Sequence, residues 1–412
     1  MTKTSIPGVH IDVHIIQTLP LSGLNLDADG NPKSVVIGGV QRARLSPQAQ
    51  KRAARLHLEN VLPEEAAVRT RRLIHTVSDL LIAQKWPKAV AEHAAVDVFV
   101  AASAGTMALG STSDSEDEES NSKDPLATAA LIYTPATTAG KLAAVAATHR
   151  DAYEAAVAAG KSLPKPKAKG GKSKGKAAKP EDATIADPKE LAGLLASANG
   201  SIALLGRTLM EIGGAERDSS VQVASAFTTH EAVVEVDFFV AVDDYAAASE
   251  GVPDVGQMGD SQQTAGTFYR YTTINLPSLL QDIDNDTDLA RRLCEAFIDG
   301  FIHTLPATGQ TNSAAWTLPD LVHITVRSDR PVNLSTAFDK PIRTQYDGHV
   351  GPSIAALATY AHSIEKITAN RGVVHAVHAH TATDELRGLG KRIDNYTDLV
   401  RKALDAAFGT TA

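Results

Sequence analysis

Cysteine is nearly absent from this chain, which contains one among 412 residues. That residue, Cys294, can form neither an internal disulfide nor a cysteine-based zinc site, and its isolation fits a reducing compartment. Aromatic residues make up only 5% of the chain, and no apolar run reaches the roughly 18 residues that a membrane helix needs. The first residues lack the apolar stretch of a secretory signal. These absences predict a cytoplasmic protein that does not enter a membrane.

The composition that remains is that of a folded protein, with 43% hydrophobic and 21% charged residues. At roughly 100–200 residues per domain, the length predicts two or three structural units. The net charge of −8 disfavours nucleic-acid binding by the whole surface, but charge is concentrated locally. Residues 111–124 hold six acids and one lysine, whereas residues 161–179 hold eight lysines and no acid. Neither segment can bury a core, so both are predicted to be solvated loops.

Alternating apolar residues predict strands at 9–18, 233–242 and 267–276. The last two flank a polar stretch, which indicates one long β-hairpin. Further strands are expected at 40–45, 201–210, 221–230 and 321–329, and helices at 64–110, at 284–303 and in the last 60 residues. A helix is predicted to begin at Ser46, with Pro47 in its first position, where a missing N–H is tolerated. The predicted class is α+β, with a sheet built from distant segments, a helical insertion and a protruding hairpin.

Basic residues are densest between positions 33 and 55. Six of them fall in this window, and no acid occurs between Ser34 and Leu58; the six are Lys33, Arg42, Arg44, Lys51, Arg52 and Arg55. On a helix, Lys51 and Arg55 lie four residues apart and repel each other, with Gln48 on the same face. A bound anion would relieve that repulsion, and the helix N-terminus offers free N–H groups beside it. A plain solvated basic face is the alternative.

No catalytic signature appears in the chain: there is no Walker A loop, nucleophile elbow, HExxH motif or dinucleotide fingerprint. His10 and His14 would lie about 13 Å apart on a strand, which is too far to share a metal. Four further histidines and one pair of acids are interpreted as ordinary core or turn residues; they are His230, His375, His378, His380, Asp243 and Asp244.

Aromatic residues gather on the two predicted hairpin strands, at Phe238, Phe239, Phe268, Tyr269 and Tyr271. Cross-strand packing would explain this cluster, because aromatic pairs stabilise a two-stranded ribbon. Stacking against nucleotide bases would explain it equally well. The sequence leaves both interpretations open.

Several segments together resemble one known family. The run VHIDVHIIQTLPLSGLNLDADGNPKSVVIGGVQRARLSPQAQKRAAR is similar to the N-terminal signature of the CasC-type backbone subunit of the type I-E CRISPR Cascade complex. SIALLGR, AFTTH, VDFFVAVDD, TFYRYTTINL, NLSTAFDKP and GPSI match the same family in order, whereas residues 111–190 do not match well.

The resemblance implies a modified ferredoxin-like (RRM-type) palm with helical fingers and a β-hairpin thumb. In these terms the palm spans 1–57, 201–231 and 277–412, the fingers 58–200 and the thumb 232–276. The resemblance also implies a non-catalytic subunit without a cofactor, whose copies stack into a helical filament along the CRISPR RNA. Target DNA and other Cascade subunits would be its further partners.

The same resemblance assigns roles to individual residues. Contacts to the guide backbone fall on Lys33, Arg42, Arg44, Ser46, Gln48, Lys51 and Arg55. The thumb residues that displace a nucleotide are Phe238, Phe239 and Val240. Lysines that would attract duplex DNA are Lys172, Lys174, Lys176 and Lys179, although a solubilising linker is the alternative for this segment.

Two departures from the family pattern occur near the basic segment. Leu26-Asp27-Ala28 stands where other members have Arg-Asp-Asp, and Val40-Gln41 where relatives often carry another base. Asp27 also supports a different hypothesis, because backbone subunits of the related type III effectors cleave RNA with an aspartate in the loop after the first strand. A metal-dependent ribonuclease is therefore the alternative function. No helix-turn-helix signal supports a transcriptional regulator.

Overall fold

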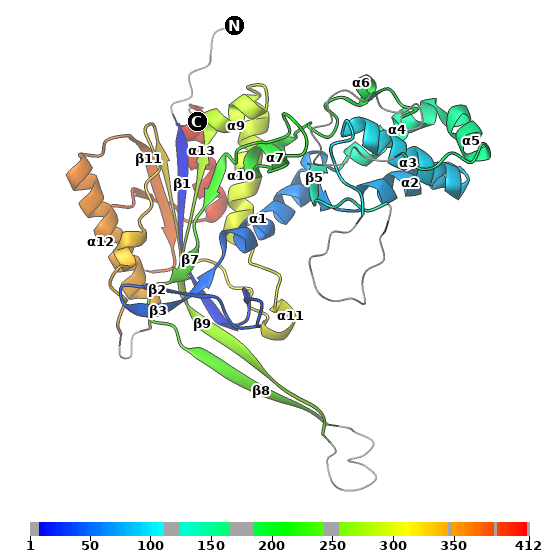
Figure 1. The fold of residues 1–412 in the computed structure, drawn as a ribbon. Helices are drawn as coiled ribbons and strands as arrows, with labels where there is room; N and C mark the ends of the chain where they lie inside the picture. Colours follow the sequence, from blue (N-terminus) through cyan, green and yellow to red (C-terminus); the bar gives the residue numbers. More distant parts are fainter. Residues whose placement is uncertain are drawn as a thin grey trace, which may run out of the picture. The chain divides into compact units, whose positions relative to one another are not determined.

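The computed structural model describes residues 8–110, 124, 126–164, 184–242, 255–344, 348–382 and 385–409. The chain forms two compact units (Figure 1). Met1–Val61 and Ser220–Ala412 make up unit 1, and Leu62–Ser219 make up unit 2. The predicted insertion ended at residue 200, but residues 201–219 cluster with unit 2, which corrects that boundary. Among the described residues, no helix combines the length and the apolar character needed to span a bilayer.

Unit 1 is built on a ten-stranded sheet in the order β12-β11-β10-β1-β9-β7-β3-β2, with β6 and β8 also paired to β9. Every pairing is antiparallel except that of β11 with β12. The strands are β1 (His10–Ser22), β2 (Ser34–Ile37), β3 (Val40–Leu45), β6 (Val221–Val223), β7 (Ala226–Thr228), β8 (Val234–Val242), β9 (Val255–Asn275), β10 (Leu321–Arg327), β11 (Val373–His380) and β12 (Lys391–Arg392). The predicted long hairpin is therefore formed by β8 and β9.

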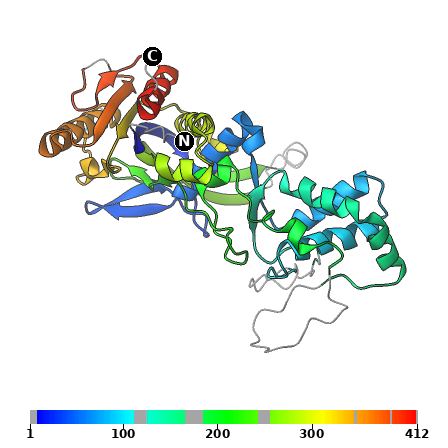
Figure 2. The ribbon, with the colours of Figure 1, turned by 90° about the horizontal axis from the view of Figure 1, so that it is seen from above.

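Helices cover both faces of this sheet (Figures 1 and 2). They are α1 (Pro47–Val61), α9 (Leu276–Asp282), α10 (Thr287–His303), α11 (Gln310–Ser313), α12 (Val350–Thr368) and α13 (Tyr396–Phe408). Successive residues of a strand point to opposite faces, and β9 shows the consequence. Tyr269 packs in the cluster that includes Ile354 and Leu357 of α12, whereas Arg270 reaches α1 and α10 on the other side.

Local signals explain where these helices begin. Ser46 precedes α1, and its Oγ accepts a hydrogen bond from the N–H of Ala49 at 3.3 Å, as expected for a helix that begins with Pro47. Asp286 caps α10 and Asn395 caps α13 through the same kind of side-chain acceptor. In unit 1, strands β2, β11 and β12 were not predicted; β11, VVHAVHAH, lies in the C-terminal region that was predicted to be helical.

Arg270 is the polar centre of unit 1. Its side chain is almost fully buried, at 1% exposure, and its guanidinium donates three hydrogen bonds to three different elements. Nη1 donates to Oε1 of Gln17 on β1 at 2.6 Å, Nε to Oε1 of Gln50 on α1 at 3.3 Å, and Nη2 to the carbonyl of Phe301 on α10 at 2.7 Å. Burial lowers the pKa of Arg270 to about 9, so the group is still charged at neutral pH.

Unit 2 is mainly helical. Its elements are β4 (Ala67–Thr70), α2 (Leu73–Ala83), α3 (Lys88–Ala102), β5 (Ile132–Pro135), α4 (Thr138–Thr148), α5 (Arg150–Ala158), α6 (Pro188–Leu191) and α7 (Gly200–Leu205). The strand predicted at 201–210 is wrong, because residues 200–205 form α7, capped by Asn199. Helix α3 is buried along most of its length, since its small alanines allow neighbouring helices to approach closely.

A buried carboxylate fixes the chain that follows the lysine-rich segment to unit 2. Asp97 on α3 accepts hydrogen bonds from the Tyr153 hydroxyl on α5 at 2.8 Å and from the N–H groups of Ile185 and Ala186, each at 2.9 Å. The predicted loops 111–124 and 161–179 lie largely outside the described residues, as do Lys172, Lys174, Lys176 and Lys179.

Replacing Arg270 with leucine should destabilise unit 1 by about 3–5 kcal/mol. The substitution leaves two buried amides and one buried carbonyl without their donor, and each unpaired group costs about 1–3 kcal/mol. Urea unfolding, with hydrogen exchange to locate the effect in unit 1, measures the loss. Arg401→Leu is the matched control, because its ion pair with Asp398 is exposed and should be worth no more than about 1 kcal/mol. Equal losses in the two variants would contradict the role given to Arg270.

Candidate nucleic-acid interface

The structure separates the basic residues of positions 33–55 into buried and accessible ones. Arg42 on β3 is fully buried, and burial lowers its pKa. Its guanidinium donates to the carbonyls of Thr228 at 2.7 Å, Phe338 at 3.1 Å and Ile37 at 3.3 Å. Arg42 therefore ties the β2–β3 turn to β7 and to the 3-10 turn Ser335–Phe338. The expectation that Arg42 contacts the guide does not fit this burial.

The predicted repulsion between Lys51 and Arg55 is relieved inside the protein. Arg55 is buried and forms an ion pair with Glu59, one turn further along α1, at 2.9 Å. The Lys51 Nζ donates to the carbonyl of Val221 on β6 at 2.9 Å. Protein groups thus compensate these charges in the structure. The expected guide contact by Arg55 does not fit its burial and its ion pair with Glu59.

The first turn of α1 presents different residues to the surroundings. Ser46 is buried, and its N–H donates to Oδ1 of Asn25 at 2.7 Å, so its polar groups serve the helix end. Gln48 is exposed, and Arg52 is exposed one turn further along. Because residues four apart share a helix face, Gln48 and Arg52 form an accessible polar side of α1.

Lys33 and Arg44 form the accessible part of the basic segment. They are neighbours across the start of the β2–β3 pair, where the N–H of Arg44 donates to the carbonyl of Lys33 at 2.8 Å. Both are half-buried and line a recess together with Ser22, Asn25 and Thr264. The Nε of Arg44 is buried and has no hydrogen-bond partner in the described part of the chain. An orphaned cationic donor beside a lysine is suited to bind an anionic oxygen.

Asp27 lies in the loop between β1 and β2, near this recess. Its Oδ1 accepts hydrogen bonds from the N–H groups of Asp29 at 3.0 Å and Asn31 at 2.9 Å, which closes the turn around Gly30. Its carboxylate is therefore used to hold the loop, as is common for aspartate in turns. Among the described residues, no group of three or more histidine, cysteine, aspartate or glutamate side chains could hold a metal.

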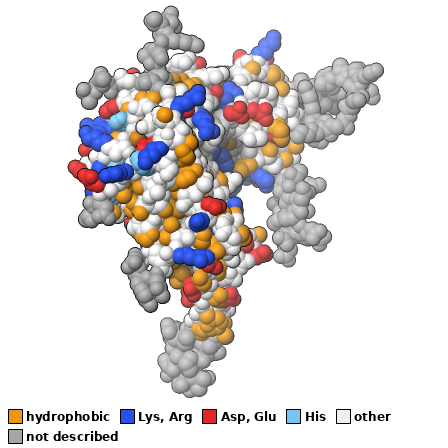
Figure 3. All heavy atoms as spheres, turned by 90° about the vertical axis from the view of Figure 1, so that its left-hand side faces the viewer, with side chains coloured by type: hydrophobic (Ala, Val, Ile, Leu, Met, Phe, Trp, Pro, Cys, Tyr) orange, Lys and Arg blue, Asp and Glu red, His pale blue; other side chains and the backbone are white. Residues whose placement is uncertain are grey.

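The hairpin formed by β8 and β9 carries exposed apolar side chains (Figure 3). Phe238 is 59% exposed, Phe239 46% and Val240 43%, with Val236 and Met258 exposed beside them. Such an apolar surface is typical of a contact with another molecule. Phe268, Tyr269 and Tyr271 further along β9 are instead buried in the core, where Tyr269 donates to Oδ1 of Asn333. The aromatic residues of the two strands thus fall into an exposed group and a packed group.

The histidines predicted to be structural are mostly enclosed. His14 on β1 and His323 on β10 are buried with ring centroids 5.3 Å apart, and burial lowers the pKa of both. The Nδ1 of His378 on β11 lies 3.1 Å from the carbonyl of Leu389. Asp243 and Asp244 lie outside the described residues.

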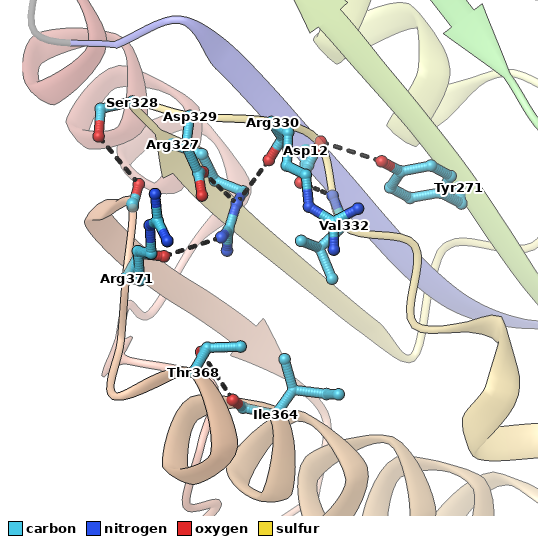
Figure 4. Close-up of polar contacts among 11 residues, drawn as sticks. Asp12, Tyr271, Arg327, Ser328, Asp329, Arg330, Val332, Ile364, Thr368 and Arg371 are labelled. Atoms are coloured by element: carbon cyan, nitrogen blue, oxygen red, sulfur yellow. Dashed lines mark hydrogen bonds and ion pairs between the residues drawn. The ribbon is translucent and has the colours of Figure 1, made fainter.

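A buried carboxylate in the sheet was missed by sequence reasoning (Figure 4). Asp12 on β1 accepts hydrogen bonds from the Tyr271 hydroxyl at 3.0 Å and the Val332 N–H at 2.8 Å. Burial raises its pKa to about 6. Nearby, Arg327 donates to Asp329 and to the carbonyls of Arg330 and Arg371. Together these contacts fasten the segment after β10 to the sheet, on the side where α12 packs.

Comparisons with known proteins agree with one another. A family model described as "CT1975-like protein" matches residues 11–401. A solved structure titled "CRISPR RNA-guided surveillance complex, pre-nicking" contains a chain that is 36% identical, with a TM-score of 0.82, over 97% of this chain and 100% of that chain. A second, titled "CRISPR RNA-guided surveillance complex", is 31% identical, with a TM-score of 0.72 and the same coverage of both chains. A comparison with curated protein sequences gives no match.

Asp12 should impose a measurable pH dependence on stability. The native carboxyl keeps its proton up to about pH 6, whereas the unfolded chain releases it near 3.8, so the native state binds more protons between these values. The free energy of unfolding should therefore fall as pH rises through this window. Relative to Asp12→Asn, the wild-type protein should lose about 2 kcal/mol between pH 4.5 and 7.5. Urea unfolding of both proteins measures the difference, and parallel pH profiles would refute the prediction.

Proposed function

This chain belongs to the CT1975-like family, and we propose that unit 1 holds the guide RNA of a CRISPR surveillance complex by its phosphates. The chain is a backbone subunit of the type I-E Cascade surveillance complex. We further propose which of its residues contact the guide RNA. The family resemblance implies contacts by seven residues in 33–55, and the fold leaves only some of these residues accessible.

Two accessible cations carry the proposal. The Nε of Arg44 is buried and has no hydrogen-bond partner among the described residues, and Lys33 lines the same recess as Arg44. A phosphate oxygen would supply the missing acceptor. Gln48 and Arg52 on the exposed side of α1 would extend the contact along the RNA backbone. Phosphate binding of this kind is independent of sequence, as a subunit that holds any guide requires. The target would then be recognised by base pairing with the guide.

The finer architecture is proposed from the family resemblance. The sheet of unit 1 would be a modified ferredoxin-like palm, unit 2 the helical fingers and the β8–β9 hairpin the thumb. Copies of the chain would form a filament along the guide, with each thumb displacing one nucleotide of the RNA at a regular interval. The exposed Phe238, Phe239 and Val240 support this role, because they supply an accessible apolar surface on the hairpin.

Two further roles follow from residue chemistry. The lysine-rich segment, with Lys172, Lys174, Lys176 and Lys179, would attract duplex DNA through charge alone.

Catalysis is not part of the proposed function. Asp27 uses its carboxylate to close its own turn, so we assign it to loop structure and not to RNA cleavage.

Replacing Lys33 and Arg44 together with alanine should weaken RNA binding and flatten its salt dependence. Each phosphate contact to a single strand contributes about 0.7 to the slope of log K against log salt, so the double variant should lose about 1.4. Titration of labelled RNA across a salt series measures the slope. Arg401→Ala with Lys402→Ala removes the same charge from the exposed side of α13 and serves as the matched control. An unchanged slope in the Lys33 and Arg44 variant would refute the assignment.

Replacing Phe238 and Phe239 with serine should abolish the periodic displacement without unfolding the protein. Both side chains are largely exposed, so their loss should change the free energy of unfolding by less than about 0.5 kcal/mol each. Chemical footprinting of the guide in the assembled complex should show the regular reactive positions only in the wild type. Val36→Ser, at an exposed apolar residue of β2, is the control. A footprint that keeps its period in the double variant would show that the hairpin is not the thumb.

A further inference from the structure

Two histidine rings are stacked where the hairpin joins the sheet. His230 follows β7, and His349 immediately precedes α12. Their ring centroids lie 3.7 Å apart with an interplanar angle of 22°. No catalytic or metal-binding group among the described residues accompanies the pair. The two rings form an aromatic stack in which His230 is buried and His349 is half-buried.

The inner ring is rigidly held in one tautomer. The Nδ1 of His230 lies 2.7 Å from the carbonyl of Glu231, so it must be the protonated, donating nitrogen. Nε2 is then free to accept the Thr267 N–H, at 3.1 Å. Gly266 is required beside it, because a Cβ at that position would lie 2.9 Å from Nε2. His230 is therefore a neutral ring with no freedom to rotate.

The outer ring is held by the start of α12. The N–H of Ser353 donates to the carbonyl of His349 at 3.0 Å, and the Ser353 hydroxyl lies 2.8 Å from that of Thr229. These contacts fix His349 over His230. His349 is only half-buried, and within the described residues neither of its ring nitrogens forms a hydrogen bond. The hydrogen-bonding capacity and part of the ring of His349 are thus available to a ligand.

Among the described residues, Arg42 is the charged side chain that acts on His230, and its guanidinium already donates to three carbonyls. The Ile342 N–H donates to the Thr229 carbonyl at 2.9 Å, and Lys340 and Arg343 in the same segment are exposed. Glu231 and Asp339 are exposed in the same region. A neutral ring that is packed against a second ring suits a flat, uncharged ligand that stacks on its face.

We propose that His349, backed by His230, is a stacking platform for one unpaired nucleobase of the guide RNA. The proposal rests on the function proposed above, because it takes the RNA to be bound by unit 1. It adds a contact of a different kind: Lys33 and Arg44 hold phosphate by charge, whereas His349 holds a base by its ring face. Base stacking tolerates every base, so such a platform is compatible with any guide sequence.

The test uses the full-length chain and single-stranded RNA oligonucleotides, each with one 2-aminopurine, whose fluorescence is quenched when the base stacks. Wild-type protein should quench at least one position. His349→Ala should lose that quenching and bind RNA about tenfold more weakly. The loss should be similar at low and high salt, unlike that of the Lys33 and Arg44 variant. His349→Phe should retain both affinity and quenching, and His362→Ala, further along α12, is the control.

The outcomes separate this inference from the proposed function. If the wild-type protein binds no RNA, the proposed function fails and the platform fails with it. If the wild type binds RNA but His349→Ala matches it in affinity and fluorescence, only the platform is overturned. If His349→Phe is as impaired as His349→Ala while both keep the wild-type melting temperature, ring stacking is overturned as the mechanism. If His349→Ala weakened binding to a partner subunit and left RNA binding unchanged, the ring would be assigned to that subunit. This outcome would also overturn the inference.

Discussion

The buried guanidinium of Arg270 is the interaction on which unit 1 depends. It sits between β9, β1, α1 and α10, and it supplies a hydrogen bond to each of the last three. Burying a charge is unfavourable unless its donors are satisfied, so the three acceptors and the guanidinium require one another. This mutual requirement fixes where α1 begins relative to the sheet. The position of α1 in turn sets which of its side chains can reach an RNA.

Arg42 extends the same principle to the other side of the sheet. Both arginines use their charge to organise backbone and amide oxygens, and neither presents that charge to a ligand. In the proposed function, Lys33 and Arg44, which line the recess, bind phosphate, and Gln48 and Arg52 on α1 extend the contact. The proposed interface therefore uses three of the six basic residues in 33–55. It is also more rigid, because the strands that carry it are held by buried hydrogen bonds.

Sequence patterns predicted the elements whose signals are local. Period-2 alternation found β1, β8 and the last part of β9, and Pro47 marked the first residue of α1. The family was recognised from short motifs spread along the chain and is confirmed by the comparisons. The misses have physical reasons. Helix α7 is apolar enough to pass for a strand, and β11 contains alanines and histidines that strands do not favour. Which arginines are buried depends on acceptors far away in sequence, such as Thr228 and Phe301, and no local pattern reports them.

The most direct test of where the guide phosphates bind is a structure of the assembled complex with its guide RNA, at a resolution that shows phosphate oxygens. A phosphate oxygen should lie within hydrogen-bond distance of the Arg44 Nε and the Lys33 ammonium. Arg42 should still be bound to the carbonyls of Thr228 and Phe338. An RNA backbone that passes elsewhere and leaves the Arg44 recess without a phosphate would contradict it. Release of Arg42 from its carbonyls to contact the RNA would contradict it equally.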